Sequence, residues 1–158
     1  MTLEEFYYLS QIGAGIGVIA TLVFVGIQIR QNTQALRAAN YAKTTDSFNA
    51  VNLAVASHEG LGTIMARGMP SDLSALTPVE RVRFDFAALS AFRIFEVLHY
   101  QQKLGLSDKE LWDAERATLL ELVRAPGLRV WWQENRLSFT KEFRTLMNDV
   151  VEEAQKTV

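Results

Sequence analysis

The sequence contains no cysteine, and it has only two histidines and three prolines among its 158 residues. Without cysteine the chain cannot form a disulfide framework, a thiolate metal site or a thiol nucleophile. It also lacks a Ser-His-Asp order, a phosphate-binding glycine loop, a His-Glu-x-x-His zinc motif and a dinucleotide fingerprint. The two histidines leave few groups that could act as an acid or base near neutral pH. The sequence therefore predicts neither an enzyme nor a bound cofactor.

An excess of basic charge is absent as well. The chain has 16 Lys and Arg residues and 18 Asp and Glu residues, which give a formal net charge of −2. Glu4 and Glu5 are the only charged residues before Arg30, so residues 30–158 carry equal numbers of acidic and basic side chains. Domains that bind nucleic acid usually present a strongly basic patch. We therefore expect no nucleic-acid partner.

Charge is missing altogether from residues 6–29, where only Ser10, Gln11, Thr21 and Gln28 are clearly polar. A helix of 24 residues covers about 36 Å, whereas the hydrocarbon core of a bilayer is about 30 Å thick. The sequence therefore predicts a transmembrane anchor over residues 1–29, with the lipid bilayer as its first partner.

Two other interpretations of this run are a cleaved signal peptide and a buried core helix. A signal peptide has basic residues before its apolar run and small residues after it, but here Glu4 and Glu5 precede the run and Arg30 follows it. A buried core helix is disfavoured by the length of the uncharged run.

The charges that flank the run predict its orientation. Arg30, Arg37 and Lys43 follow it, whereas no Lys or Arg precedes it. Basic residues favour the cytoplasmic side of a membrane. We expect the N-terminus outside and residues 30–158 in the cytoplasm.

Gly13 and Gly17 lie one helical turn apart within the apolar run. Small residues at this spacing let two helices approach closely in lipid, so the pair predicts a helix-to-helix contact in the membrane. The alternative is that glycine is simply frequent in membrane-spanning helices.

The remaining sequence predicts helices. The first helix is expected to continue to residue 57 because no proline or glycine interrupts residues 30–57. Capping boxes at residues 77–80 and 107–110 predict helices that end near residues 103 and 124, and a last helical segment over residues 128–155 is expected to break near Ser138 and Thr140. Residues 60–76 resemble a connection with room for a short helical turn.

No alternating pattern long enough for a strand is present. We therefore predict an all-α fold in two parts. Residues 1–29 form the anchor and residues 30–158 a cytoplasmic helical bundle, in which the long first helix packs with about three further helices.

Glu96 and His99 have the Glu-x-x-His spacing of carboxylate metal sites, but the sequence contains no second copy of this motif, and we predict no metal. Arg93 and Glu96 lie one turn apart on an otherwise apolar helix. A partly buried ion pair is the structural interpretation, and a site for an anion or a polar head group is the functional one.

Aromatic and guanidinium groups are concentrated in residues 126–143, where Trp131, Trp132 and Arg136 stand out. Such groups serve as helix-packing anchors, as interface hot spots or as walls of a ligand pocket. The sequence leaves these three roles open.

Three segments of the sequence carry a resemblance to a family. They are Gln28-Ile29-Arg30-Gln31-Asn32-Thr33-Gln34-Ala35-Leu36-Arg37-Ala38 after the apolar run, Phe92-Arg93-x-Phe95-Glu96, and Pro126-Gly127-x-Arg129-x-Trp131-Trp132 with Phe139 and Glu142-Phe143. Together they resemble a widespread group of small bacterial single-pass membrane proteins of unknown function. The resemblance implies an anchor in the bacterial inner membrane and a helical cytoplasmic domain, and it assigns no catalytic residue.

These observations lead to two main functional hypotheses, and a third, a metal-dependent enzyme that uses Glu96 and His99, is disfavoured by the missing second motif. The first is a non-enzymatic, membrane-anchored scaffold or accessory subunit that forms homo-oligomers or joins a larger membrane complex. The second is a tethered sensor or binding domain that holds a small apolar or anionic ligand near Arg93, Glu96, Trp131, Trp132 and Arg136.

Overall fold

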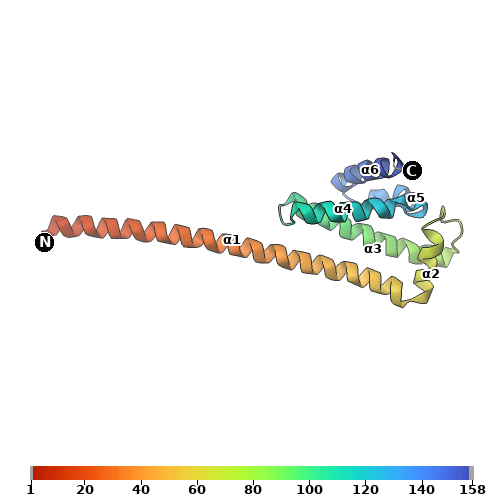
Figure 1. Cartoon of the computed structure of the whole chain (residues 1–158), viewed down its shortest axis with the longest axis horizontal. Helices are drawn as coiled ribbons and strands as arrows, with labels where there is room; N and C mark the ends of the chain where they lie inside the picture. Colours follow the sequence, from red (N-terminus) through yellow and green to blue (C-terminus); the bar gives the residue numbers. More distant parts are fainter. Residues whose placement is uncertain (1, 157–158) are drawn as a thin grey trace. The chain divides into compact units, whose positions relative to one another are not determined.

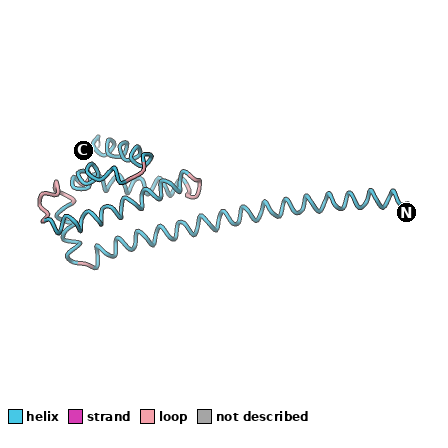
Figure 2. The backbone as a smooth tube through the Cα atoms, turned by 180° about the vertical axis from the view of Figure 1, so that it is seen from behind, coloured by secondary structure: helices cyan, strands magenta, loops and turns pink. Residues whose placement is uncertain are grey.

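The computed structural model describes residues 2–156, and this part of the chain is all-α, as predicted (Figure 2). The elements in chain order are α1 (Leu3–Ser57), α2 (Glu59–Gly68), α3 (Pro78–Lys103), α4 (Lys109–Arg124), α5 (Pro126–Asn135), the 3-10 helix η1 (Arg136–Ser138) and α6 (Lys141–Lys156). Contacts divide the chain into two units, one that ends at Ala39 and one that begins at Asn40 (Figure 1).

The first unit is the N-terminal part of α1. Every side chain from residue 2 to residue 39 is exposed. By length and composition, α1 could cross a membrane. Helix α1 ends at Ser57, the residue at which the sequence predicted its end.

Helix α3 shows how local sequence positions a helix. The hydroxyl of its N-cap residue, Thr77, accepts a hydrogen bond from the backbone N–H of Glu80, and the Glu80 carboxylate accepts one from the backbone N–H of Thr77. Pro78 occupies the first helical position, where a missing N–H costs nothing. The helix ends at Lys103, just before Gly105 adopts the left-handed φ of 68°. Both predicted ends of this helix are confirmed.

The second predicted capping box is wrong. Helix α4 begins one residue later than expected, with Asp108 at its N-cap position, and the Asp108 side chain makes no capping hydrogen bond. The Ser107 hydroxyl donates to the carbonyl of Asp108 instead, at 3.4 Å. The predicted C-terminus of this helix at Arg124 is confirmed.

Two segments contain more helix than the sequence predicted. The expected connection after residue 60 holds α2, a helix of ten residues, despite its three glycines. The last segment begins at Pro126 and divides into α5 and α6, because Phe139 adopts an extended backbone after η1. The break lies where Ser138 and Thr140 predicted it, and the Thr140 hydroxyl accepts a hydrogen bond from the backbone N–H of Phe143 at 3.4 Å. The long helix is thus followed by five α-helices rather than about three.

The core of the second unit lies among the last four α-helices and α2. Helices α3 and α4 run antiparallel, α4 also packs against α5 and α6, and α2 packs on α3 (Figure 1). The side chain of Phe92 lies at the centre of an aromatic cluster that contains Trp131, Trp132 and Phe139. Ordinary hydrophobic burial therefore stabilises this unit.

One face of α3 is not covered. The apolar residues of α3 occupy more than one face of the helix, but two of them remain largely exposed: Val82 is 53% exposed and Phe86 is 67% exposed. Only one side of α3 contributes to the core, through residues such as Phe84, Phe92 and Phe95. The other side borders open space along α1.

Candidate functional site

The Arg93 and Glu96 side chains form the ion pair that their spacing predicted. Glu96 is 8% exposed, and its Oε1 accepts a hydrogen bond from the backbone N–H of Thr140 at 2.7 Å. Arg93 Nη2 donates to the carbonyl oxygen of Ser138 at 3.1 Å, and its guanidinium carbon lies 4.7 Å from the centre of the Phe139 ring. The pair therefore connects the middle of α3 to Ser138 and Thr140, just before α6. Both side chains are bonded to groups of the protein.

Trp131 and Trp132 of α5 are 1% and 0% exposed. Their rings stack against Phe92 with centroid distances of 5.2 and 5.5 Å, and Phe143 meets the Trp132 ring edge-on at 5.8 Å. Within the described chain neither indole N–H has a hydrogen-bond acceptor. The two residues pack helices together, the first of the three roles that the sequence left open for them.

The structure does not bring Arg136 into this cluster. Its side chain is exposed, and it makes no hydrogen bond or ion pair with any residue that the structure describes. Four of the five residues singled out in the bundle thus lie together, and Arg136 lies apart from them.

His99 packs against Trp112 and Phe143, with ring centroids 5.5 and 6.3 Å away. Burial lowers the pKa of His99, while the nearby charges of Glu142 and Glu96 oppose this shift and Lys103 adds to it. No group of three or more potential metal ligands occurs among residues 2–156.

Gly13 and Gly17 lie on the exposed part of α1. A Cβ atom added at either position would have no heavy atom within 4 Å. This face of the helix has the room that close helix-to-helix packing requires.

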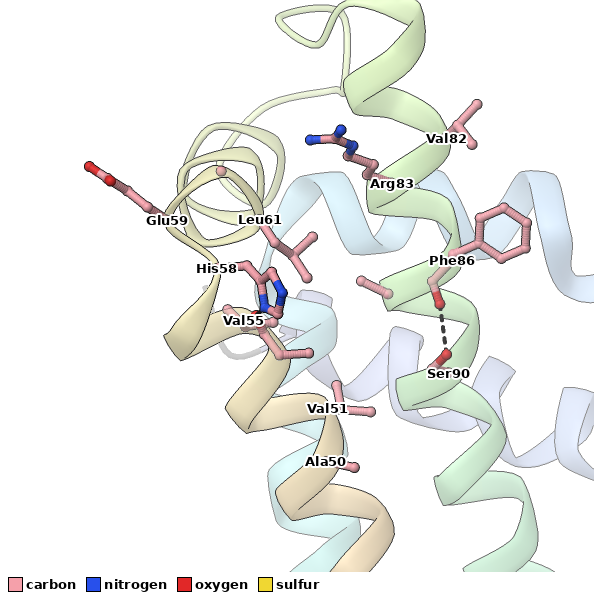
Figure 3. A pocket seen from close by; sticks show the side chains of 13 residues that line it. Ala50, Val51, Val55, His58, Glu59, Leu61, Val82, Arg83, Phe86 and Ser90 are labelled. Atoms are coloured by element: carbon pink, nitrogen blue, oxygen red, sulfur yellow. Dashed lines mark hydrogen bonds between the residues drawn. The ribbon is translucent and has the colours of Figure 1, made fainter.

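A groove of about 770 Å³ lies where α1, α2 and α3 meet, within the second unit. Its apolar lining comes from all three helices and includes Val51, Val55, Leu61, Val82 and Phe86. Figure 3 shows Val51, Val55 and Leu61 projecting toward the space beside α3. Small side chains at Ala50, Ala54 and Ala87 keep this space open.

Charged groups lie at the end of the groove that is nearest α2. Arg83 projects from α3 toward α2, whereas the Glu59 carboxylate projects away from α3 (Figure 3). The structure gives Arg83 no ion-pair partner among the residues it describes. The Nδ1 atom of His58 lies 3.1 Å from the carbonyl oxygen of Ala54.

Sequence reasoning missed this groove. Its two walls are about 30 residues apart in the chain, and only the fold brings them together. The one available signal was the apolar residue pattern of α3, which covers more of the helix surface than a single buried face needs.

A scan against protein-family models gives no match, and searches of curated proteins and of solved structures give none either.

Proposed function

We propose that the chain is a non-enzymatic, membrane-anchored helical scaffold or accessory subunit that self-associates or attaches to a larger membrane complex. The observation that carries this proposal is the exposure of α1. None of the 18-residue apolar window within α1 is buried by the described chain. Such a surface requires lipid, another protein or both, because exposing it to water is costly.

The proposed membrane is the bacterial inner membrane. Arg30, Arg37 and Lys43 follow the apolar run, which under the positive-inside rule supports a cytoplasmic location for residues 30–158 and an outer location for the N-terminus. The resemblance of three sequence segments to small bacterial single-pass membrane proteins supports the same location.

The proposed contact between copies, or with another subunit, is the glycine face of α1. The open space at Gly13 and Gly17 supports it, since a partner helix can approach the backbone there without displacing a side chain of this chain.

The first test is the native mass of the protein after gentle extraction from its own membranes, measured by native mass spectrometry with identification of every bound component. We expect a defined homo-oligomer or a stoichiometric complex with other membrane proteins. A monomer without any bound protein would contradict the scaffold proposal. The N-terminus is tested separately by its accessibility to a membrane-impermeant reagent in intact cells, and protection there would contradict the orientation.

A second candidate function is a tethered binding domain for a small apolar or anionic ligand. The observation that favours it is the groove beside α3, whose volume of about 770 Å³ lies within the range of about 300–1,000 Å³ found for ligand sites. The cluster around Glu96 is less suitable, because the Arg93 and Glu96 side chains are bonded to protein groups and both indoles are buried. In the same native spectra, a small-molecule adduct on the protein would support this function, and adduct-free protein would contradict it.

A further inference from the structure

We propose that the groove between α1, α2 and α3 binds an amphiphile with a single alkyl chain and an anionic head group, of which a long-chain fatty acid is the simplest example. The chain would lie against Val51, Val55 and Leu61, and the head group would meet Arg83. This inference rests on the second candidate function and specifies its ligand class and residues.

The apolar part of the ligand follows from the lining. The walls are aliphatic side chains from α1 and α2 together with Val82 and Phe86 of α3, whose side chains are more than half exposed. Covering them removes apolar surface from water, which favours a hydrocarbon occupant. The only hydroxyl side chain in the lining, on Ser90, donates to the backbone carbonyl of Phe86 at 2.8 Å.

The size of the groove favours one alkyl chain over a docked helix. An α-helix with its side chains is about 10–12 Å across, so each turn fills roughly 400–600 Å³. A volume of about 770 Å³ therefore holds fewer than two helical turns. The groove wall on α1 begins at Ala50 and reaches the end of the helix at Ser57, just before His58, which is about 11 Å of helix and suits an extended hydrocarbon chain.

The anionic head group follows from charge complementarity at one end of the groove. The neighbouring arginines already have carboxylate partners: Arg67 pairs with Glu80, and Arg81 pairs with both Asp85 and Glu134. Arg83 has none within the described part of the chain, and it projects toward α2 at the groove (Figure 3). Gly60 leaves room beside it, since even a Cβ there would lie 3.8 Å from Arg83 Nη1. A planar guanidinium is suited to two parallel hydrogen bonds with a carboxylate.

The test uses the full chain in nanodiscs of zwitterionic phosphatidylcholine and a fatty acid that carries a photoreactive diazirine on its alkyl chain. After irradiation, mass spectrometry of proteolytic peptides locates the label. We expect label within residues 50–61 and 82–90. Label within residues 6–29 reports fatty acid dissolved in the bilayer and serves as the internal reference. Label in residues 6–29 alone would overturn the proposal.

Three competitors with twelve-carbon chains and different head groups distinguish recognition of the head group from recognition of the hydrocarbon. Dodecanoate should reduce groove labelling relative to the reference, whereas dodecyl maltoside and dodecyltrimethylammonium should do so far less. Equal competition by all three would overturn the anionic head group while leaving a ligand-binding function in place. A diazirine-bearing phospholipid that labels the groove as strongly as the fatty acid would overturn the single-chain class.

Two variants and one control complete the experiment. Arg83→Gln should lower groove labelling about threefold to fivefold, the effect of losing one partly exposed ion pair, and Ala54→Phe should abolish it by filling the groove. Arg144→Gln removes an arginine from α6, outside the groove, and should leave labelling unchanged. Tryptophan fluorescence shows whether each variant is folded. A folded Arg83→Gln protein that labels like the wild type would overturn the role of Arg83.

Discussion

Gly13 and Gly17 in the first unit have nothing within 4 Å of where a Cβ would lie, whereas a Cβ on Gly127 in the second unit would lie 2.0 Å from the carbonyl oxygen of Gly68. The backbone N–H of Gly127 also donates to the carbonyl oxygen of Met69 at 2.9 Å. In the second unit glycine allows the backbones of α2 and α5 to pack directly against each other. In the first unit glycine leaves a surface that the described chain does not use. Glycine therefore lies at a helix-to-helix contact within the second unit, whereas in the first unit it lies on a surface that no described residue contacts.

This contrast predicts where a substitution affects folding and where it affects association. All three tryptophans, Trp112, Trp131 and Trp132, belong to the second unit. Tryptophan fluorescence during chemical denaturation therefore measures the stability of the bundle without a contribution from the apolar part of α1.

The largest loss is expected for Trp132→Ala. Its fully buried ring contacts Phe92, Phe139 and Phe143, so truncation leaves a cavity at the centre of the core. We expect a cost of about 3–5 kcal/mol in the free energy of unfolding. Trp132→Phe, which keeps an aromatic ring, should lose less. Equal losses for the two variants would show that the cavity is not the cause.

Gly127→Ala should follow, with a loss of about 3 kcal/mol. The added methyl group cannot fit beside the Gly68 carbonyl, so the backbones of α2 and α5 must separate. The matched control is Gly26→Ala, because nothing lies within 4 Å of that position and the bundle should keep its unfolding midpoint. An unchanged free energy of unfolding in Gly127→Ala would show that α2 and α5 do not approach each other this closely.

Glu96→Gln tests the connection between α3 and α6. Glutamine keeps an oxygen for the backbone N–H of Thr140 but removes the charge that pairs with Arg93. We expect a loss of about 2 kcal/mol because hydrogen bonds to a buried charged group are strong. In the control Glu121→Gln, which breaks an exposed pair with Arg124, the change should stay below about 0.5 kcal/mol. Similar effects at both positions would mean that burial of Glu96 contributes nothing.

A smaller effect is expected from pH. Burial lowers the pKa of His99 below its ordinary value of 6.5, so the unfolded chain binds the proton more readily than the folded one. The contribution of His99 is therefore fully present above about pH 6.5 and is lost as the pH falls toward the lower pKa of the folded state. Denaturation curves between pH 7 and pH 5 should show this loss. His99→Gln should flatten it. An unchanged slope in the His99 variant would refute the assignment.

The smallest effect on stability, and the largest on association, is expected for the double substitution Gly13→Leu and Gly17→Leu. Because both positions are open, the free energy of unfolding of the bundle should stay within about 0.5 kcal/mol of the wild-type value. Cross-linking in detergent should show weaker assembly, since the leucines keep a partner helix away from the backbone. Gly26→Leu is the control outside the pair. Unchanged cross-linking in the double variant would rule out the glycine face as the contact.

The elements that could be predicted from the sequence are those determined locally. Thr77, Pro78 and Glu80 specify the start of α3 within four residues, and Gly105 specifies its end. The same reasoning failed at Ser107, because the next residue, Asp108, occupies the N-cap position and its side chain makes no capping hydrogen bond. Local patterns identify a helix more reliably than its first residue.

The features that could not be predicted depend on contacts between distant residues. Helix α2 contains three glycines and looks like a connection, but Ile64 and Gly68 are buried, so packing on α3 stabilises it as a helix. The Arg93 and Glu96 pair could be predicted from its spacing, whereas the bond from Thr140 to Glu96, which joins residues 44 positions apart, could not. The groove was missed for the same reason.

The motif Pro126-Gly127-x-Arg129-x-Trp131-Trp132 now has a structural task at each fixed position. Pro126 begins α5, and Gly127 allows the crossing with α2. Arg129 donates to the carbonyl oxygens of Val123 and Arg124 at 3.0 and 2.6 Å, which satisfies the C-terminal end of α4. Both tryptophans are buried, so the motif forms the tight turn from α4 into α5 and the packing of α5 on its neighbours.

The crossing of Gly68 and Gly127 also constrains how this sequence can diverge. A side chain at residue 127 meets backbone, and one at residue 68 would lie 2.7 Å from the Phe84 ring, so neither position can accept even alanine without moving its neighbours. Homologous chains with this bundle should hold glycine at both positions, while positions 13 and 17 exchange among glycine, alanine and serine. An alignment of such chains would then separate glycines kept by the fold from glycines kept by a partner.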